Sequence, residues 1–519
     1  MRVIPAQVWD RQWLVRGISF CLPSSRCPLR LDLDSANFPQ RTVYARPGVL
    51  GWFKGGPRAA KAVRSQHDAP THPIGRFLAG DVYHSAMGIP SGDQTLPRAV
   101  YWFAALAFVL RVLARLHSGA AAFWENGYTF FFVMAQSIAA GKGIRLPSVD
   151  NGPLTAFRVP LYPMFLAAIT GGHQVFWPIL IAESLLGAGV VMCAALLARQ
   201  MFGEPLGART AVIAAGISAI YPYYVMHDTA LQESSLFAFL TILAVVVIQR
   251  AARTEAFWFA ALGGLVLGLD VLTRCTIAPF ALLVPFWLTW RRRTAAGLLC
   301  ALTLALTVSP WLWRNYELTG SPTLSTEAGL ELWTGNNGFL FRHYPKESSD
   351  ISQDEGLAAL SAQDKLKLNQ MVGHEALQNR WFLQKAMVYI QGHPWLTFTN
   401  GLRKIVAGYY WLPSPRHSLA ENLVYAFSYV PVMLLGLWGM WLHRFHWRDD
   451  LLIYALFAVF TLISAVFWAH TFHRIYLDVY WMVFGAWALA SVPARGEPSR
   501  ISRGAHRGSA VAVEQGQSR

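Results

Sequence analysis

Charged side chains are scarce in this chain of 519 residues: only 14% are Asp, Glu, Lys or Arg, whereas 54% are hydrophobic. Soluble domains carry about a quarter charged residues, so this composition argues against an ordinary soluble globular protein. Apolar runs of bilayer length, separated by polar stretches, are instead typical of a chain that crosses a membrane repeatedly. An integral membrane protein is therefore the first hypothesis.

Cysteine is also scarce, and the chain shows neither an internal repeat nor a secretory signal peptide. No apolar run follows the basic N-terminal residues before a small-residue cleavage site, as a signal peptide requires. The few cysteines show no metal-ligand spacing, and we expect them to be small apolar core residues rather than metal ligands or redox groups. They are Cys21, Cys27, Cys193, Cys275 and Cys300.

The formal net charge is +15, which raises the question of a nucleic-acid partner. The basic residues form neither a single patch nor a stripe interleaved with aromatics, so we expect no such partner. They fall mainly in the N-terminal region, between apolar spans and in the C-terminal tail. In a membrane protein this distribution marks the cytoplasmic side, and Arg291-Arg292-Arg293 is interpreted as such a topology signal.

The apolar runs predict an all-α polytopic helix bundle, since a helix needs about 20 residues to cross a bilayer. The loop charges then place both termini in the cytoplasm. We predict ten spans, at about 99–117, 174–198, 209–226, 231–250, 256–273, 277–290, 296–313, 422–442, 451–470 and 475–493.

The polar segments divide the chain further. Residues 395–411 mix aromatics with Arg403 and Lys404 and predict an interfacial amphipathic helix; an eleventh span is the alternative, but it would place the basic tail outside. Met87 is an alternative start of the native protein. We expect a disordered cytoplasmic region at 1–96, a first transmembrane module at 97–313 with an outer loop at 118–173, an extracytoplasmic loop at 314–421, transmembrane helices at 422–493 and a basic cytoplasmic tail at 494–519.

The first outer loop, from Trp124 to Pro163, is the stretch around which the other segments are expected to assemble. It begins with an acid, Glu125, just beyond the first span. Apolar residues at helical spacing follow from Tyr128, and Gly141 lies where that helix is expected to stop. We interpret this segment as a membrane-surface loop that carries a catalytic carboxylate.

Polar groups gather at the predicted outer ends of several spans, where a purely structural bundle would not need them. A lipid-phosphate sugar donor would use this set, because Arg offers a bidentate fork to phosphate oxygens and a carboxylate can deprotonate an acceptor hydroxyl. Fixed cations would stabilise the leaving phosphate. The candidates are Glu125, His227-Asp228, Glu233, Arg274, Arg314 and His473-Arg474.

The chain resembles membrane glycosyltransferases of the GT-C superfamily, in the branch of dolichyl-phosphate-mannose–protein mannosyltransferases and bacterial aminoarabinose transferases. The similar residues span roughly 99 to 493 in family order. They are Glu125, Tyr128, Ala135, Gly141 and Gly143; Arg158, Pro160, Leu161, Tyr162 and Pro163; Gln232-Glu233-Ser234; Leu272-Thr273-Arg274; Pro310-Trp311 with Arg314-Asn315; Gly335-Asn336-Asn337; and Arg474-Ile475-Tyr476.

The resemblance implies a GT-C transmembrane bundle, a polyprenyl-phosphate-linked sugar donor, and transfer to a glycan, lipid or protein on the extracytoplasmic face. It implies catalytic roles for Glu125 and Glu233. Many relatives have Asp, or an Asp-Glu pair, where this chain has Glu125-Asn126, so a Mg²⁺ or Mn²⁺ cofactor is left open. We expect a bacterial inner membrane as the location. Substrate-binding roles are expected for Arg158, Tyr162, Arg274, Arg314, Asn336, Asn337, His473 and Arg474.

Simpler interpretations stay open for these residues: Glu233 as an acid that favours a helix N-terminus, and Arg274 and Arg314 as residues that flank spans. Two other classes of protein also compete. A transporter or flippase would place charges at mid-bilayer and show repeated halves. A ligase or polymerase of pyrophosphate-linked glycans would share the lipid carrier and the outer face. The sugar and the acceptor are not predicted.

Overall fold

The computed structural model describes residues 95–125, 127–147, 153–347, 351–413, 418–468 and 470–492, and these residues are organised as helices. The one β element in these ranges is an isolated antiparallel bridge between Leu146 and Leu154. The all-α prediction is thus confirmed. The predicted cytoplasmic N-terminal region, apart from residues 95 and 96, and the whole predicted tail lie outside the described residues.

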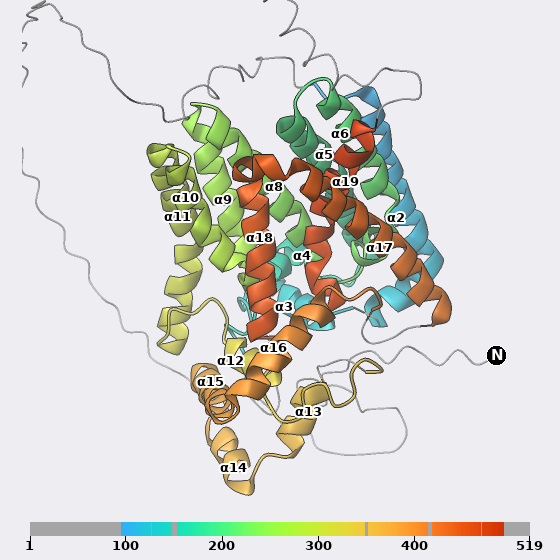
Figure 1. Cartoon of the computed structure of the whole chain (residues 1–519). Coiled ribbons are helices and arrows are strands. Elements are labelled where there is room, and N and C mark those ends of the chain that lie inside the picture. Colours follow the sequence, from blue (N-terminus) through green and yellow to red (C-terminus); the bar gives the residue numbers. More distant parts are fainter. Residues whose placement is uncertain are drawn as a thin grey trace, which may run out of the picture. The chain divides into compact units, whose positions relative to one another are not determined.

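Every predicted span corresponds to a helix (Figure 1). By length and composition alone, five helical stretches of the described chain could cross a membrane: α2, α5, α8, α11 and the α17–α18 stretch. The count of ten spans stays a prediction. The ten helices are α2 (Arg98–Glu125), α5 (Phe176–Phe202), α6 (Leu206–Ile220), α8 (Ser234–Arg253), α9 (Phe257–Thr273), α10 (Ala278–Trp290), α11 (Thr294–Thr319), α17 (Leu419–His443), α18 (Trp447–Val466) and α19 (Ile475–Ser491).

The connections contain shorter helices. The first connection forms α3 and α4, and Gly141 beyond α3 has a φ of 71°, which accounts for the predicted stop there. The long connection after α11 is more ordered than its polar composition indicated. The shorter helices are α3 (Thr129–Ala139), α4 (Leu161–Thr170), α7 (Pro222–His227), η1 (Cys275–Ile277), α12 (Ala328–Thr334), α13 (Ile351–Ala358), α14 (Ala362–Gln370), α15 (Glu375–Gly392), α16 (Pro394–Gly408), η2 (Arg444–His446) and η3 (Thr471–Arg474).

Small residues set how closely the main helices pack. Helices α9 and α11 lie against one another, and a Cβ on Gly264 would come within 2.2 Å of the Cys300 carbonyl oxygen. A Cβ on Gly268 would lie 2.5 Å from Cβ of Thr307. This four-residue spacing of glycines lets two apolar helices approach backbone to backbone, as membrane helices commonly do.

The exposed side of the bundle is apolar, as a lipid-facing surface requires. On α11, Leu298, Leu302 and Leu306 repeat every four residues on one face and are all exposed. In contrast, α19 is buried on nearly every side, since it packs against α17, α6, α5 and α8. The bundle therefore has a central helix and a lipid-facing periphery.

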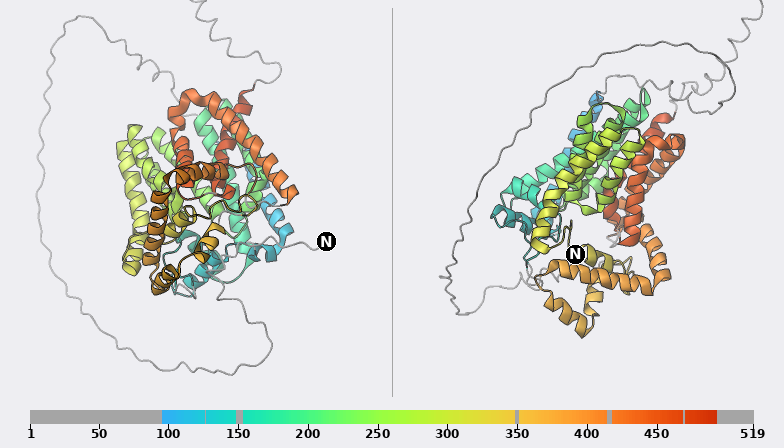
Figure 2. Two further views of the ribbon diagram at one scale, coloured as in Figure 1. Left: turned by 60° about the horizontal axis from the view of Figure 1, so that its bottom comes forward. Right: turned by 90° about the vertical axis from the view of Figure 1, so that its left-hand side faces the viewer.

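The connection from α12 to α15 has an apolar core of its own, made by Leu332, Trp333, Trp381, Phe382 and Ala386. Figure 2 shows these helices and α16 in two further views. The predicted interfacial helix corresponds to α16, whose exposed face carries Trp395, Phe398 and Val406. Its position on a membrane stays a prediction.

Helix α2 ends later than the predicted span at 99–117. It continues to Glu125, with a break at Gly119, where φ is 84°. The residues beyond the break, Ala120 to Trp124, are apolar and Ala-rich, a composition that favours helix. Glu125 is therefore the last residue of a helix rather than the first residue of a loop.

Candidate active site

The end of the bundle where α9 stops and α8 starts brings two oppositely charged candidates together. Glu233 immediately precedes α8 and is buried, and Arg274 immediately follows α9. These helices pack against each other, so the turn into one lies beside the turn out of the other. The Arg274 Nε atom is 3.9 Å from Glu233 Oε1, which is beyond hydrogen-bonding distance. Arg274 also lies over the Phe237 ring, with Cζ 5.7 Å from its centroid.

The start of the first outer loop packs directly on the segment that leads into Glu233. The Tyr128 backbone N–H donates to the Leu231 carbonyl at 2.9 Å. A Cβ on Gly127 would lie 2.5 Å from Cβ of Leu231, so only glycine fits there without a shift. Glu125, which is exposed, is two residues from this contact, and Glu233 is two residues beyond it on the other segment. The two predicted catalytic acids thus lie on segments in contact.

Tyr162 is buried and donates a hydrogen bond to Glu183 Oε1 at 2.6 Å. Tyr162 also lies within electrostatic reach of Glu233 and hydrogen-bonds the backbone of Gln232. Glu183 was not among the predicted site residues. Its signal was a lone acid inside the apolar run at 174–198, which is costly at membrane depth unless the acid has a partner.

Two arginines of α2 continue this network inside the bundle. Arg111 pairs with Asp228 at 2.7 Å, and both side chains are buried. Arg115 donates to Thr229 Oγ1 at 3.2 Å and acts electrostatically on Glu183. Asp228 is thus the partner of Arg111 inside the bundle.

Arg158 brings a second cation to the same end of the bundle. Its Nη2 atom pairs with Glu327 Oε1 at 2.8 Å, and its guanidinium lies over Phe130, with Cζ 5.3 Å from the ring centroid. Cys275, the residue after Arg274, lies within electrostatic reach of Arg158, Glu327 and Arg274 alike. Arg158 and Arg274, which are far apart in the sequence, therefore both lie near Cys275.

Arg314 holds the backbone of the first connection. It donates to the carbonyl oxygens of Thr155 at 3.0 Å and Ile144 at 3.2 Å, and it lies over the Trp311 ring with Cζ 4.6 Å from the centroid. Glu375 completes this clamp by accepting hydrogen bonds from the backbone N–H groups of Thr155 and Ala156. Arg314 thus fixes the loop before Arg158, and its predicted phosphate role stays a prediction.

The two predicted asparagines lie at the end of α12 and bond mainly to backbone. Asn336 Nδ2 donates to the Leu332 carbonyl at 2.8 Å and to the Val466 carbonyl at 2.9 Å. Asn337 Nδ2 donates to the Trp333 carbonyl at 3.1 Å, while its oxygen accepts from the Phe339 N–H. These bonds shape the turn after α12, and the substrate roles of both residues stay predictions.

A buried cation lies beside Asn336. Lys404 of α16 donates to the carbonyl oxygens of Val466 and Phe467, both at 3.0 Å, and to that of Gly335 at 3.2 Å. Burial lowers the pKa of its ammonium group to about 8. Lys404 therefore ties α16 to the end of α18 through backbone carbonyls.

Arg474 is fully buried, and its contacts are with residues other than Glu233 and Arg274. Its guanidinium pairs with Asp478, donates to the Gly408 carbonyl at 2.8 Å and stacks on Tyr429, with Cζ 3.5 Å from the ring centroid. These partners belong to α19, α16 and α17. His473 precedes it in η3 and accepts from the His470 N–H. Their predicted head-group role is untested, and Arg474 joins three helices.

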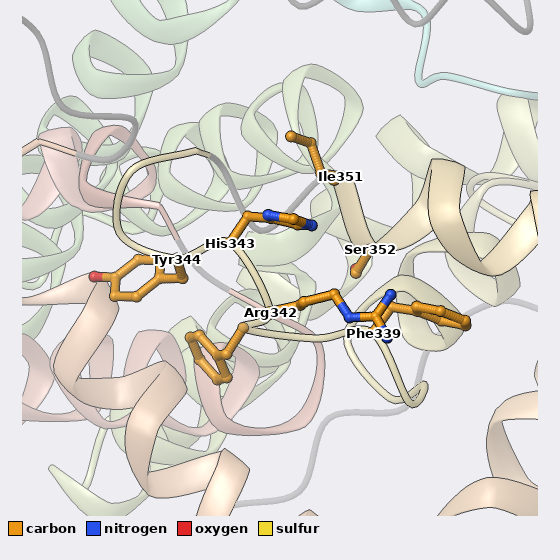
Figure 3. Close-up of a pocket in the computed structure, with 7 residues that line it drawn as sticks. Phe339, Arg342, His343, Tyr344, Ile351 and Ser352 are labelled. Atoms are coloured by element: carbon orange, nitrogen blue, oxygen red, sulfur yellow. The ribbon is translucent and has the colours of Figure 1, made fainter.

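The connection after α12 contains a shallow recess lined by Phe339, Arg342, His343 and Tyr344 among others (Figure 3). His343 Nε2 lies 2.8 Å from Glu355 Oε1, and Arg342 lies 3.6 Å from the same oxygen. The recess holds none of the predicted site residues.

Metal ligands are sparse in the described ranges, which contain no group of three or more His, Cys, Asp or Glu side chains arranged to hold an ion. Glu125 and Glu233 are the two carboxylates that the contacting segments offer. Hard carboxylate oxygens suit Mg²⁺ or Mn²⁺, which often bind through one or two carboxylates together with substrate phosphate.

The fold and these pairs define a polytopic helical membrane protein with acids and arginines at the ends of its helices. Residues 158–313 match the dolichyl-phosphate-mannose-protein mannosyltransferase family, so the resemblance predicted from the motifs is confirmed there. The matched residues include Arg158, Tyr162, Glu233 and Arg274. No curated protein is significantly similar to the chain.

Solved structures of an archaeal oligosaccharyltransferase from Archaeoglobus fulgidus are similar at 15% identity. AglB with an inhibitory peptide and a dolichol-phosphate gives a TM-score of 0.43, over 75% of this chain and 50% of that chain. The apo form gives 0.45, over 76% and 50%. The complex with Zn and sulfate gives 0.43, over 76% and 48%. The chain thus spans about half the length of these structures.

Proposed function

We propose that this chain is a membrane glycosyltransferase that transfers a sugar from a polyprenyl-phosphate donor to an acceptor on the extracytoplasmic face. The observation that carries the proposal is the Glu233–Arg274 pair, together with the contact of the first loop with Leu231, two residues before Glu233. The family match over residues 158–313 supports a mannosyltransferase-like activity. The acceptor is a glycan, lipid or protein, and a bacterial inner membrane is the proposed location.

In the proposed reaction, an acceptor hydroxyl attacks the anomeric carbon while Glu125 accepts its proton. The bond between that carbon and the phosphate oxygen breaks, and the phosphate leaves with the electron pair. Such direct displacement inverts the anomeric configuration. Glu125 suits the base because its carboxylate is exposed, whereas that of Glu233 is largely buried beside a cation.

The leaving phosphate gains negative charge, so a cation fixed beside it lowers the barrier. Arg274 suits this role because no hydrogen bond within the described part of the chain uses its side chain, and its Glu233 contact is loose. Glu233 would orient Arg274. Arg158 would be a weaker ligand of the donor phosphate, since it already pairs with Glu327 at 2.8 Å. Tyr162 would stabilise the buried side of the site.

A divalent ion, if the reaction uses one, would bind the carboxylates of Glu125 and Glu233. Bound there, it would neutralise charge on the donor phosphate.

The test is Glu125→Gln in the purified protein with a lipid-linked donor. Gln keeps the size of the side chain but cannot accept the proton, so we expect turnover to fall at least about 100-fold. The control is Glu317→Gln, a second exposed acid at a helix end outside this site. Unchanged turnover in Glu125→Gln would remove Glu125 from the mechanism.

A transporter is the second candidate, because buried ionisable groups inside the bundle, such as Arg111, Asp228 and Glu183, are typical of transport pathways. Turnover of a lipid-linked sugar in detergent, where no ion gradient exists, separates the two classes.

A further inference from the structure

A second region of interest lies at the opposite end of the bundle from the Glu233–Arg274 pair. Helix α8 begins at the pair and ends at Arg253, and α9 begins at Phe257 and returns to it. The turn between them, together with the turn from α10 to α11, borders an open cavity of about 340 Å³. Thr254, Glu255, Arg292 and Arg293 are among its polar lining residues.

Arg292 has a backbone conformation that a non-glycine residue rarely adopts. Its φ is 62°, in the left-handed region, where a Cβ crowds the following carbonyl. Its side chain is exposed and makes no hydrogen bond or ion pair with any described residue. Glycine would adopt this conformation with less strain, so the topology signal of Arg291-Arg292-Arg293 does not by itself explain an arginine at this one position.

Arg293, the neighbouring cation, is only weakly neutralised. Its Nη1 atom lies 3.7 Å from Glu255 Oε1, and the Glu255 side chain is 92% exposed. In contrast, Arg291 points to another partner, Asp449, at 3.0 Å. The cavity thus has two arginines with unused donors and one weak counter-charge.

Exposed aromatic residues lie at the same end of these helices, and one of them, Phe257, lines the cavity. Phe257 and Trp258 begin α9 and Trp290 ends α10, and all three are exposed. Aromatic side chains of this kind gather at the level of the lipid head groups in membrane proteins. An open cavity at that depth, lined by arginines, would be within reach of a lipid head group.

We propose that this cavity binds the phosphate of an anionic phospholipid head group, with Arg292 as the main ligand and Arg293 as the second. The planar guanidinium suits a phosphate diester because it donates two parallel hydrogen bonds. Basic pockets between transmembrane helices bind anionic head groups in this way. The site is separate from the proposed glycosyltransferase site and does not depend on it.

The test compares lipid retention of full-length wild type, Arg292→Gly and Arg292→Ala by native mass spectrometry in detergent. Phosphatidylglycerol and phosphatidylcholine are added in separate arms, and inorganic phosphate is added in a third. Arg209→Ala is the matched control, since Arg209 is also exposed and lies in the first turn of α6 at this end. Thermal unfolding of each variant is measured with and without lipid.

We expect wild type and Arg209→Ala to retain phosphatidylglycerol over phosphatidylcholine, and both Arg292 variants to bind it about fivefold more weakly. Arg292→Gly should unfold at the same or a higher temperature than wild type, because the backbone strain is gone. Competition by inorganic phosphate would identify the site as a general phosphate site rather than one for lipid. Equal phosphatidylglycerol retention in wild type and both Arg292 variants would overturn the proposal.

Discussion

Arg274 and Glu233 face each other across the turns of two adjacent helices, with Nε of the arginine 3.9 Å from Oε1 of the acid. This separation is short enough for charge attraction and too long for a hydrogen bond. The arginine is therefore oriented while its donors stay available. An arginine already saturated by its own protein, as Arg474 is by Asp478 and the Gly408 carbonyl, lacks that freedom.

Replacing Arg274 tests whether its available N–H donors bind the donor phosphate. We expect Arg274→Ala to lower kcat about 100-fold, because a fixed cation stabilises charge that develops in the transition state. Arg274→Lys should fall between Ala and wild type, since lysine keeps the charge and loses the fork. Initial rates with a polyprenyl-phosphate sugar measure this, with Arg209→Lys as the control. A wild-type rate in Arg274→Ala would exclude the phosphate role.

The Tyr162–Glu183 hydrogen bond predicts an asymmetry between two conservative variants. Tyr162→Phe leaves a buried carboxyl without its donor and should destabilise the protein by about 1–3 kcal/mol. Glu183→Gln keeps an acceptor for the tyrosine and should cost less. Thermal unfolding in detergent compares the two. Equal losses of stability would mean that the bond at 2.6 Å contributes little.

Gly187 predicts a packing effect on the Arg111–Asp228 pair. A methyl group there would lie 2.2 Å from Arg111 Nε and 2.8 Å from Asp228 Oδ2, so one partner must move. Gly187→Ala should therefore destabilise by about 1–3 kcal/mol, as overpacking of a full interior does. Gly338→Ala is the control, because a methyl group there meets nothing within 4 Å. Similar unfolding temperatures for the two variants would contradict the prediction.

Lys404 predicts a rise of stability with pH. Burial lowers the pKa of its ammonium group from 10.5 to about 8, so the unfolded chain binds this proton more tightly than the folded chain does. Stability linked to Lys404 is therefore lowest below about pH 8 and increases toward pH 10.5, by at most about 3 kcal/mol. Unfolding measured across this range in wild type and Lys404→Met should show a steeper rise in wild type. Parallel curves would show that Lys404 does not titrate in this range.

The sequence was informative where one physical requirement dominates. Apolar runs of bilayer length identified the helices, and the acid and the arginine at 233 and 274 were selected because ionisable groups at span ends are costly without a use. The sequence could not show which polar side chains would form their hydrogen bonds with backbone carbonyl groups. Arg314 resembles Arg274 as a residue at a helix end, but its donors meet carbonyl oxygens of the distant Thr155 and Ile144. Asn337 donates instead to the Trp333 carbonyl of α12, the helix that it follows.

The length of α2 and the packing of α4 on α5 could not be predicted from the sequence either. The Ala-rich residues after Gly119 extend α2 to Glu125, whereas the apolar run alone ended the span earlier. Glu183 was missed because nothing in a single apolar helix indicates that a tyrosine twenty-one residues earlier will fold back onto it. Such contacts arise only when α4 and α5 pack together.

We propose that this chain breaks the bond between a sugar and a polyprenyl phosphate where α2 and α9 end and α8 begins. The most direct measurement supplies purified wild-type protein in detergent with a polyprenyl-phosphate sugar of known anomeric configuration and follows the product by NMR. We predict release of polyprenyl phosphate without any ion gradient, inversion at the anomeric carbon, and loss of both in Glu125→Gln and Arg274→Ala. Release that continues unchanged in both variants, or a product of retained configuration, would contradict the account.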